Sequence, residues 1–407
     1  MSGQCHTQSP KLEDAGSGVP PRTVAEFFAG IGLMRLGLEQ AGWRVQFAND
    51  IDPQKAAMYR ANFPDAAAHF CLGDIHQIPA SEIPSVTLAT ASFPCNDLSL
   101  AGGREGLHGE NSSAFWGFVN ILRNMKNRRP LLVLIENVPG FLTSRGGRDF
   151  EDAMLALNDL GYSVDPFCLD AAWFVPQSRQ RIFVVGIRTP PYDSSALHDR
   201  FFESRVRPTV LADFIFSHPD INWQLRNLPE PPKGGWLLED ILEDLPPRAV
   251  EWWSAERAEY LLNQMSPRHR KIADAMIAGT AWSYGTVFRR VRNDRSMAEL
   301  RTDGLAGCLR TPRGGSGRQI LFRAGKGKYQ VRLLTPRECA RLMGAPDFKI
   351  DVPVNQALFG FGDAVCVPAV RWIGEHYLNP LLEEYHAKEA PVPQTKARVH
   401  HRQTAFA

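Results

Sequence analysis

The sequence predicts an α/β protein built on a mostly parallel, doubly wound sheet, with a second and smaller module late in the chain. Short apolar runs with β-prone residues alternate with segments of helical spacing from residue 23 to about 188. The alternation stops in 189–330, where Pro, Trp, Arg and Gly are frequent, and helical spacing returns after residue 331. The chain of 407 residues is long enough for this arrangement in two parts.

The elements follow one another with short links. Residues 23–28 form a short buried strand, 33–42 an amphipathic helix, and 43–49 a second strand. Asp52 is placed to cap the helix 52–63. The later elements are strand 85–91, helix 113–125, strand 131–137, helix 148–161, strand 162–170 and strand 181–191. In such a fold, ligands are expected at the carboxyl ends of the strands.

The composition excludes several classes of protein. A hydrophobic fraction of 44% argues against a disordered chain, and no run of about 18 apolar residues is present to span a bilayer. The polar N-terminus lacks the apolar segment of a secretory signal. The seven cysteines are scattered singly, which is typical of free thiols in a reducing cytosol and predicts no metal site. The net charge is only +2, but residues 281–332 hold twelve Lys and Arg against three Asp and Glu.

A glycine loop follows the first strand. The segment Gly30–Gly32 opens a helix, where glycine lets a ligand approach the backbone, although such a pair alone is more often a tight turn. Asp50 and Asp74 follow the next strands; each alone is more often a cap, but together they indicate an adenosine site. Arg35 stands where the pyrophosphate-binding pattern needs its third glycine, which disfavours a dinucleotide. S-adenosylmethionine fits as an adenosine cofactor without phosphates.

Four further residues carry candidate chemistry. Cys95 follows a proline at a strand end, and as a nucleophile it needs an activating environment, because a free thiol is only roughly 3% thiolate at neutral pH. Glu136 ends a strongly apolar strand, where a carboxylate is costly to bury alone. It is therefore expected to be either a catalytic acid with a raised pKa or one member of an ion pair. Arg179 and Arg181 lie two residues apart, so an extended segment places both side chains on one face. The pair could bind an anion or a base carbonyl, or it could simply form a solvated edge.

With these residues in view, the sequence resembles the DNA (cytosine-5)-methyltransferase family of bacterial type. Six motifs carry the resemblance between residues 24 and about 381: FFAGIG, FPCNDLS, ENVPGF, QSRQRIF, TPRECARLMG and GFGDAVCVPAV. Their order and spacing are those of the family, which argues against a chance match. The irregular block 189–330 falls where the family keeps its variable target-recognition region.

The resemblance implies a fold: the Rossmann-like, mostly parallel sheet of S-adenosylmethionine-dependent methyltransferases with a smaller target-recognition domain, and a DNA cleft between them. The expected segments are a flexible N-terminus (1–22), a catalytic and cofactor-binding domain (23–188), a target-recognition domain (189–330), a return to the catalytic domain (331–384) and a flexible tail (385–407).

The resemblance also implies a reaction, the transfer of a methyl group from S-adenosylmethionine to carbon 5 of cytosine in a specific double-stranded DNA sequence. Cys95 resembles the nucleophile that adds to carbon 6 of a flipped-out base, and Glu136 the acid that engages N3 and the exocyclic amine. Arg181 resembles the residue that holds the base O2, and Arg179 a partner that orients the loop and supports the cysteine.

The implied binding residues form two groups. The cofactor shell is Phe28, Ala29, Gly30, Ile31, Gly32, Asp50, Ile51, Asp74, Ile75, Phe93, Asp363, Ala364 and Val365. The DNA-binding candidates are Ser99, Arg310, Arg313 and Arg318. For each arginine, pairing with guanine and contact with a phosphate stay equally open. Three positions depart from the family pattern: Leu33 replaces a frequent glycine, Asp363 a usual asparagine, and Asn111 or a neighbour a loop arginine.

The sequence leaves three hypotheses for the biological role. The first is the modification enzyme of a restriction-modification system, or one acting alone: a monomer in the bacterial cytoplasm, bound to double-stranded DNA and no membrane, with a restriction endonuclease encoded nearby. The second is the transfer-RNA branch, whose Cys-Phe-Thr signature is absent and whose recognition segment is shorter. The third is a catalytically dead DNA-binding relative, which would have lost Cys95 or Glu136.

Overall fold

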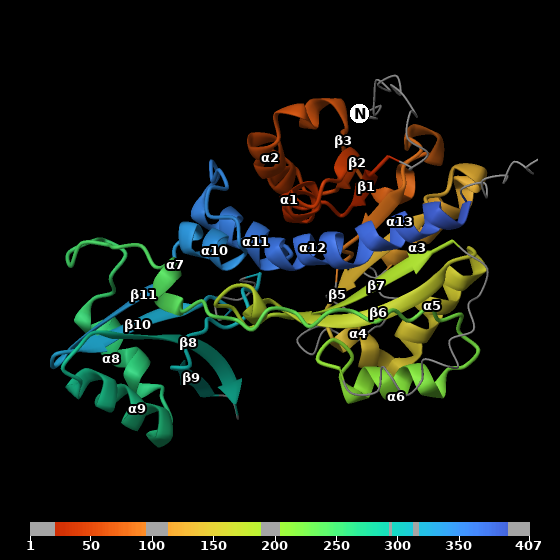
Figure 1. Ribbon diagram of the computed structural model, residues 1–407. Helices are drawn as coiled ribbons and strands as arrows, with labels where there is room; N and C mark the ends of the chain where they lie inside the picture. The colour runs from red at the N-terminus through yellow and green to blue at the C-terminus, as the bar shows by residue number, and fades with distance from the viewer. Residues whose placement is uncertain (1–20, 95–112, 189–203, 293–294, 312–316, 390–407) are drawn as a thin grey trace, which may run out of the picture.

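Two sheets organise the protein. The computed structural model describes residues 21–94, 113–188, 204–292, 295–311 and 317–389. A seven-stranded sheet has the order β3-β2-β1-β4-β5-β7-β6, and a four-stranded sheet the order β11-β10-β8-β9. Figure 1 shows the small sheet beside the large one, with the helices of the last quarter of the chain running across both parts.

The large sheet is mostly parallel. Its strands are β1 (Thr23–Phe27), β2 (Arg44–Asp50), β3 (Phe70–Leu72), β4 (Leu88–Ala91), β5 (Leu132–Asn137), β6 (Ser163–Asp170) and β7 (Gln180–Ile187). Neighbours from β3 to β5 pair in parallel, and β7 pairs antiparallel with both β5 and β6. The strand order reverses direction beside β1, so the ends of β1 and β4 flank the position where open sheets of this kind bind ligands. The predicted fold class is confirmed.

Helices cover both faces of the large sheet. In the described ranges the α-helices are α1 (Leu33–Gln40), α2 (Pro53–Asn62), α3 (Ser113–Asn124), α4 (Gly140–Thr143), α5 (Arg148–Asp159), α6 (Thr209–Ser217), α7 (Leu238–Ile241), α8 (Ala255–Asn263), α9 (Pro267–Ala278), α10 (Pro336–Leu342), α11 (Val354–Asp363), α12 (Val367–Ile373) and α13 (Asn379–Glu389). Alternate residues of β1 enter two separate cores, Val24 with α1 and α12, and Phe27 with α3 and α5. Asp52 caps α2, because its carboxylate accepts from the amides of Gln54 and Lys55.

The small sheet consists of β8 (Ser283–Arg292), β9 (Arg295–Arg301), β10 (Ile320–Gly325) and β11 (Lys328–Leu333). All its pairings are antiparallel, and α8 and α9 close its apolar core. Before this sheet begins, the chain still packs on the large one. Phe214 of α6 lies 5.1 Å from the ring of Phe150, and the amide of Arg226 donates to Asp165 at 2.9 Å.

Two features bear on the expected surroundings of the protein. The helical segment Val354–Lys388 is long and apolar enough to cross a membrane, but 67% of its most apolar window is buried inside the protein, as in the core helix of a globular domain. Cys168, Cys308, Cys339 and Cys366 are free thiols, whereas Cys71 is disulfide-bonded. The expectation of free thiols is therefore wrong at Cys71.

Candidate catalytic and cofactor site

The glycine loop after β1 has a left-handed backbone. Phe28, Gly30 and Gly32 have φ angles of 57°, 56° and 89°. A Cβ at Gly32 would lie 2.3 Å from the Phe63 ring, so this glycine is required for packing. A Cβ at Gly30 would meet no atom closer than 4.0 Å, so the backbone there is open to a ligand. The two glycines of the pattern thus have different tasks.

Asp50 ends β2 directly beside this loop. Its carboxylate accepts from the amide of Gly30 at 2.7 Å and from the amide of Asp52 at 2.9 Å. Burial raises the pKa of Asp50, while Lys55 and the two amides act in the opposite direction. Each carboxylate oxygen keeps a second lone pair for a ligand hydroxyl. The neighbouring Ile51 exposes 68% of its surface, which provides an apolar face next to these acceptors.

The other members of the cofactor shell have mostly supporting positions. Asp74 caps a short 3-10 helix, where it accepts from the amide of His76 at 3.0 Å. The side chains of Ala29, Ile31, Ile75, Phe93 and Val365 are buried. A Cβ at Gly360 would lie 2.7 Å from Ile31, so the end of α11, with Asp363, packs on the glycine loop. The open glycine, the carboxylate and the exposed Ile51 fit S-adenosylmethionine, which these residues would hold at this edge of the sheet.

Glu136 and Arg181 form an ion pair at the same edge. The guanidinium Nε of Arg181 lies 2.9 Å from Oε1 of Glu136, near the carboxyl end of β5, and both side chains are largely buried. The Glu136 carboxylate is therefore held in a fixed direction by a charged donor. Both readings of Glu136 from the sequence, ion pair and catalytic acid, are compatible with this position.

Arg179 has a different environment from Arg181. Its fully buried guanidinium donates to the carbonyls of Leu309, Gly362 and Ala364 at 2.8, 3.0 and 2.6 Å. Burial and the nearby charge of Arg181 lower the pKa of Arg179. These bonds join the start of β7, the segment before β10 and the end of α11. In this structure Arg179 therefore fixes three distant segments to one another.

The segment between β4 and Cys95 is well anchored at Phe93. Phe93 packs on the rings of Phe115 and Phe141 at 5.3 and 5.6 Å, and its carbonyl accepts from the side-chain amide of Asn137 at 3.3 Å. The described chain stops at Pro94 and resumes at α3. Cys95, Ser99, Asn111 and Arg313 lie outside the described residues, so their predicted roles stay predictions.

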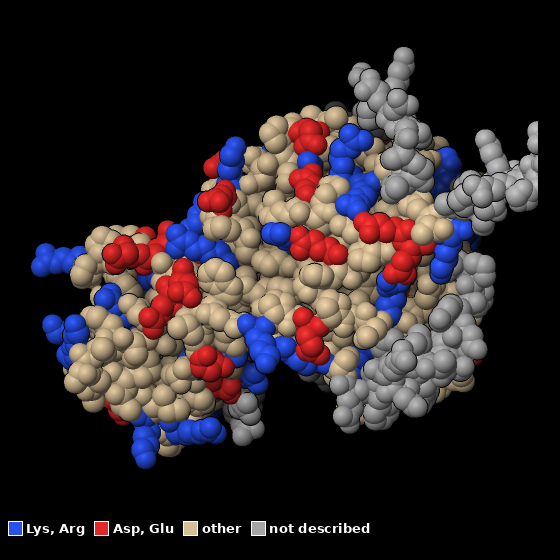
Figure 2. Space-filling view, in the orientation of Figure 1, with Lys and Arg blue, Asp and Glu red and all other residues tan. Residues whose placement is uncertain are grey.

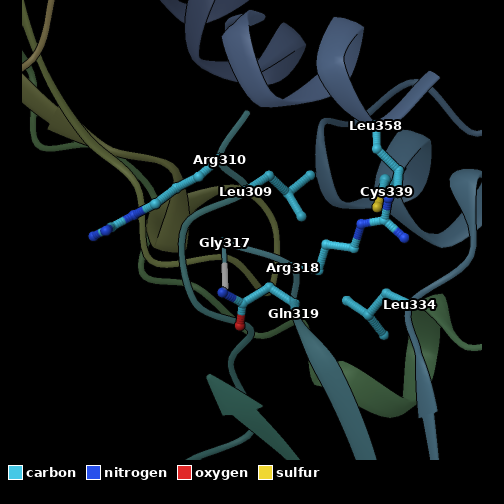
Figure 3. Close-up of a pocket in the computed structure, with 8 residues that line it drawn as sticks. All are labelled: Leu309, Arg310, Gly317, Arg318, Gln319, Leu334, Cys339 and Leu358. Atoms are coloured by element: carbon cyan, nitrogen blue, oxygen red, sulfur yellow. The ribbon is translucent and has the colours of Figure 1, made fainter. Parts of the chain in front are cut away.

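Arg310 and Arg318 line one small pocket between the two parts of the protein. Its lining residues are Leu309, Arg310, Gly317, Arg318, Gln319, Leu334, Cys339 and Leu358. Arg318 donates to Asn355 of α11, and Figure 3 shows it pointing toward Cys339 and Leu358. Arg310, by contrast, extends away from the other lining side chains (Figure 3). The exposed Arg310 is the better placed of the two to meet a substrate.

Sequence reasoning missed three residues that the fold brings to this region. Gln177 is fully buried and accepts from the amide of Leu309 at 3.0 Å. The ammonium of Lys55 lies 2.7 Å from Asp363. The thiol of Cys308 lies 3.2 Å from Arg179; burial raises its pKa, but the arginines 179, 181 and 310 outweigh burial and lower it. No local pattern marks these residues, because their partners lie far away in sequence.

A buried acid under the glycine loop gives a prediction for stability. Glu26 is 1% exposed; one oxygen accepts from the amide of Arg35 at 3.3 Å, and the other has no partner among the described residues. Burial raises its pKa from 4.5 to about 8. As pH rises through this interval, the unfolded chain loses a proton that the native protein keeps, so the native state loses stability.

Glu26→Gln is expected to remove this loss, because its amide does not titrate. The stability advantage of the variant should grow from pH 5 to pH 8, at about 1.4 kcal/mol per unit as an upper limit, and level off above pH 8. Urea unfolding at several pH values measures it. A difference between variant and parent that is the same at every pH would contradict the prediction.

The chain matches one family along most of its length. Residues 22–379 match the family model described as C-5 cytosine-specific DNA methylase. Among curated proteins, the chain is 29% identical to the Type II methyltransferase M.DsaV of Dactylococcopsis salina, over 87% of this chain and 85% of that protein. It is 27% identical to the Type II methyltransferase M.HhaI of Haemophilus parahaemolyticus, over 86% of this chain and 91% of that protein.

Solved structures agree at the level of the fold. The Dnmt2 methyltransferase of S. pombe superposes with a TM-score of 0.58 at 19% identity, over 89% of this chain and 99% of that one. The Entamoeba histolytica methyltransferase EhMeth gives a TM-score of 0.59 at 16% identity, with the same coverage. At these sequence identities, the similarity establishes the shared fold alone.

Proposed function

The chain belongs to the C-5 cytosine-specific DNA methylase family and is a DNA (cytosine-5-)-methyltransferase, and from this premise we propose its mechanism, its target and its setting. It methylates cytosine within one specific double-stranded sequence, after the base is flipped out of the helix at a cost of a few kcal/mol. The observation that carries the proposal is the Glu136–Arg181 pair, 2.9 Å apart, on the sheet edge that also holds the glycine loop and Asp50.

The residues of the chain divide the chemistry between them. The Cys95 thiolate forms a bond to cytosine C6, and the electron pair of the C5–C6 double bond moves toward C5 and N3. Glu136 engages N3 with a hydrogen bond or a proton, so that charge does not accumulate on the ring. Arg181 orients Glu136 and supports the base O2. S-adenosylmethionine, when bound, supplies the electrophilic methyl group. The C5 proton then passes to water, any proton taken up by N3 returns to Glu136, and the electrons of the C5–H bond form the C5–C6 double bond again as Cys95 leaves as a thiolate.

The DNA surface includes the small sheet as well as Arg310. β10 pairs with β8 only from Ser283 to Val287, so the rest of β8 and the start of β9 form a two-stranded ribbon beyond the sheet. Figure 1 shows the end of β8 projecting from the sheet. Arg290 and Arg295 on this ribbon are exposed. Figure 2 shows acids gathered over α7 and α13, whereas Lys and Arg lie at the junction of the two parts and along the lower edge of the small part.

Arg290→Gln is expected to weaken DNA binding about equally for all sequences, because a two-stranded ribbon of this kind can follow the DNA backbone, and a phosphate contact carries no sequence information. The slope of log affinity against log salt concentration should fall by about 1, since one phosphate contact is lost. Fluorescence anisotropy at several salt concentrations measures the slope. Arg270→Gln, on the neighbouring α9 with partners Asp274 and Glu259, is the matched control. An unchanged slope in Arg290→Gln would exclude this contact.

We place the enzyme beside the DNA it modifies, in the bacterial cytoplasm, as a monomer. The curated relatives are Type II methyltransferases, which supports a role as the modification enzyme of a restriction-modification system, with a cognate endonuclease encoded nearby, or as a methyltransferase acting alone. The cofactor is S-adenosylmethionine, in keeping with the family and the fit of the glycine loop.

Bisulfite sequencing of DNA from cells that express the protein tests the proposal. The expected result is methylation of every cytosine in one short sequence and none in cells with Cys95→Ser. Methylation spread without sequence preference would contradict the specific target. Unmethylated DNA with methylated transfer RNA would favour the transfer-RNA reading, and no methylation by a folded protein would favour the catalytically dead relative.

A further inference from the structure

One carboxylate joins the cofactor side of the site to the segment that reaches DNA. Oδ1 of Asp363 accepts from the hydroxyl of Thr311 at 2.6 Å, and Oδ2 accepts from the ammonium of Lys55 at 2.7 Å. Along the sequence, Asp363 lies 308 residues after Lys55 and 52 residues after Thr311. Asp363 therefore uses a different oxygen for each of two distant segments.

Lys55 belongs to the cofactor side. It lies in the first turn of α2, which begins at Pro53, after Asp50, Ile51 and the cap Asp52. Burial lowers the pKa of Lys55, but the carboxylates of Asp363 and Asp50 outweigh burial and raise it. Its ammonium is thus shared electrostatically between the acid of the glycine loop and Asp363. Hydrogen bonds make the same link, because Asp50 accepts from the amide of Asp52 at 2.9 Å and Asp52 accepts from the amide of Lys55 at 3.3 Å. A ligand bound to Asp50 therefore acts on the turn that positions Lys55.

Thr311 belongs to the DNA side. It follows Arg310 directly and precedes the glycine-rich segment that leads to Arg318. The backbone here is pressed against the end of α11, because a Cβ on Gly362 would lie 2.7 Å from the carbonyl carbon of Arg310 and from the amide of Thr311. Arg179 binds the carbonyls on both sides of this contact. A displacement of the Arg310 segment therefore acts directly on the bond between Thr311 and Asp363.

We propose that Asp363 is a positioning residue that couples cofactor binding to DNA binding, through Lys55 on one oxygen and Thr311 on the other. The inference rests on the proposed function, since it needs both ligands at this site. An asparagine, the residue the family pattern favours here, offers one acceptor oxygen and cannot hold an ammonium and a hydroxyl in the same way. The acid thus strengthens a connection between the two ligands that an amide makes only in part.

The test measures binding, without turnover. The full chain is titrated with S-adenosylhomocysteine, which has no methyl group to transfer, in the absence and presence of a duplex carrying the methylated sequence found by bisulfite sequencing. The parent protein is expected to bind S-adenosylhomocysteine at least about 5-fold more tightly with the duplex, and to bind the duplex more tightly by the same factor with S-adenosylhomocysteine, because binding linkage is reciprocal.

Variants separate coupling from simple support. Asp363→Asn and Thr311→Val are expected to reduce the factor toward 1. For Thr311→Val, which changes no residue of the cofactor shell, each ligand alone should bind within about 2-fold of the parent value. Thr311→Ser keeps the hydroxyl and should restore the factor. Glu384→Gln is the matched control, because it removes another ion pair between distant segments, with Arg226 at 2.6 Å, away from both ligands. Its factor should equal that of the parent.

The outcomes distinguish this inference from the function beneath it. An unchanged factor in Asp363→Asn, or a factor of 1 in the parent protein, would overturn the coupling while methylation stands. Equal weakening of both separate affinities with the factor preserved would also overturn it and make Asp363 a structural tie. Failure of the parent to methylate DNA would refute the proposed function itself.

Discussion

Cys95→Ser is expected to reduce methyl transfer by at least about 1000-fold, because a serine hydroxyl is almost never ionised at neutral pH and is a much weaker nucleophile toward cytosine C6 than a thiolate. Binding of S-adenosylhomocysteine and of DNA should stay close to the parent values. Single-turnover transfer of labelled methyl groups measures the rate. A duplex with 5-fluorocytosine traps the adduct, because fluorine cannot leave as the C5 proton does, so the parent should give a covalent complex on a denaturing gel.

Cys308→Ser is the control for this variant. Its thiol also lies beside arginines and has a lowered pKa, so it is the described cysteine that could most easily be mistaken for the nucleophile. We expect this variant to keep most of the activity and to form the covalent complex. Undiminished transfer in Cys95→Ser, or loss of the complex only in Cys308→Ser, would refute the assignment of Cys95.

Glu136→Gln is expected to lower kcat by about 100-fold to 10,000-fold, the range of a lost general acid. An amide can hydrogen-bond to N3 of the base but cannot deliver a proton to it. The change also removes the carboxylate that lies 2.9 Å from Arg181. The KM for DNA should change little, because phosphates and groove contacts supply most of the binding. Steady-state kinetics at saturating DNA separates the two constants.

A second buried pair provides the contrast. Glu338 of α10 binds Arg332 of β11 through both oxygens, at 2.5 and 2.6 Å, where the small sheet meets α10. Glu338→Gln should lower the free energy of unfolding by a few kcal/mol, about 3 to 5 for a broken buried pair, and leave kcat per folded molecule unchanged. If Glu136→Gln behaved in this way too, with kcat intact, Glu136 would be a structural residue.

The sequence predicted the order of elements in the large sheet well, because its strands are mostly apolar and its helices are amphipathic. It also placed Glu136 and Arg181 at one edge correctly, but the physical reason is that β7 runs antiparallel to β5, which brings the start of β7 beside the end of β5. It could not reveal that Arg179 turns inward to bind the carbonyls of Leu309, Gly362 and Ala364. The same holds for Lys55 and Thr311, whose meeting point on Asp363 depends on tertiary packing and leaves no local pattern.

The secondary structure of the small part is harder to predict from the sequence. Its strands carry arginine at exposed positions, and only β10 among them is buried along nearly its whole length. The hydrophobic periodicity of the sequence therefore does not predict a four-stranded sheet. The segment with α6 was also hidden, because its contacts with Phe150 and Asp165 join residues that are more than 60 positions apart. Long-range contacts of this kind decide where one compact unit ends and the next begins.

The packing of α12 and α13 on α1 has a consequence for biosynthesis. Gly37 of α1 has no room for a Cβ beside Val370, and Trp43 donates its indole N–H to Asn379 at 2.8 Å, across 336 residues of sequence. During synthesis, one apolar face of α1 therefore stays exposed until α12 and α13 have been made. Chains whose contacts join residues far apart in sequence fold slowly, and they expose aggregation-prone apolar surface until folding is complete. A nascent chain halted before residue 367 should consequently depend on chaperones to stay in solution.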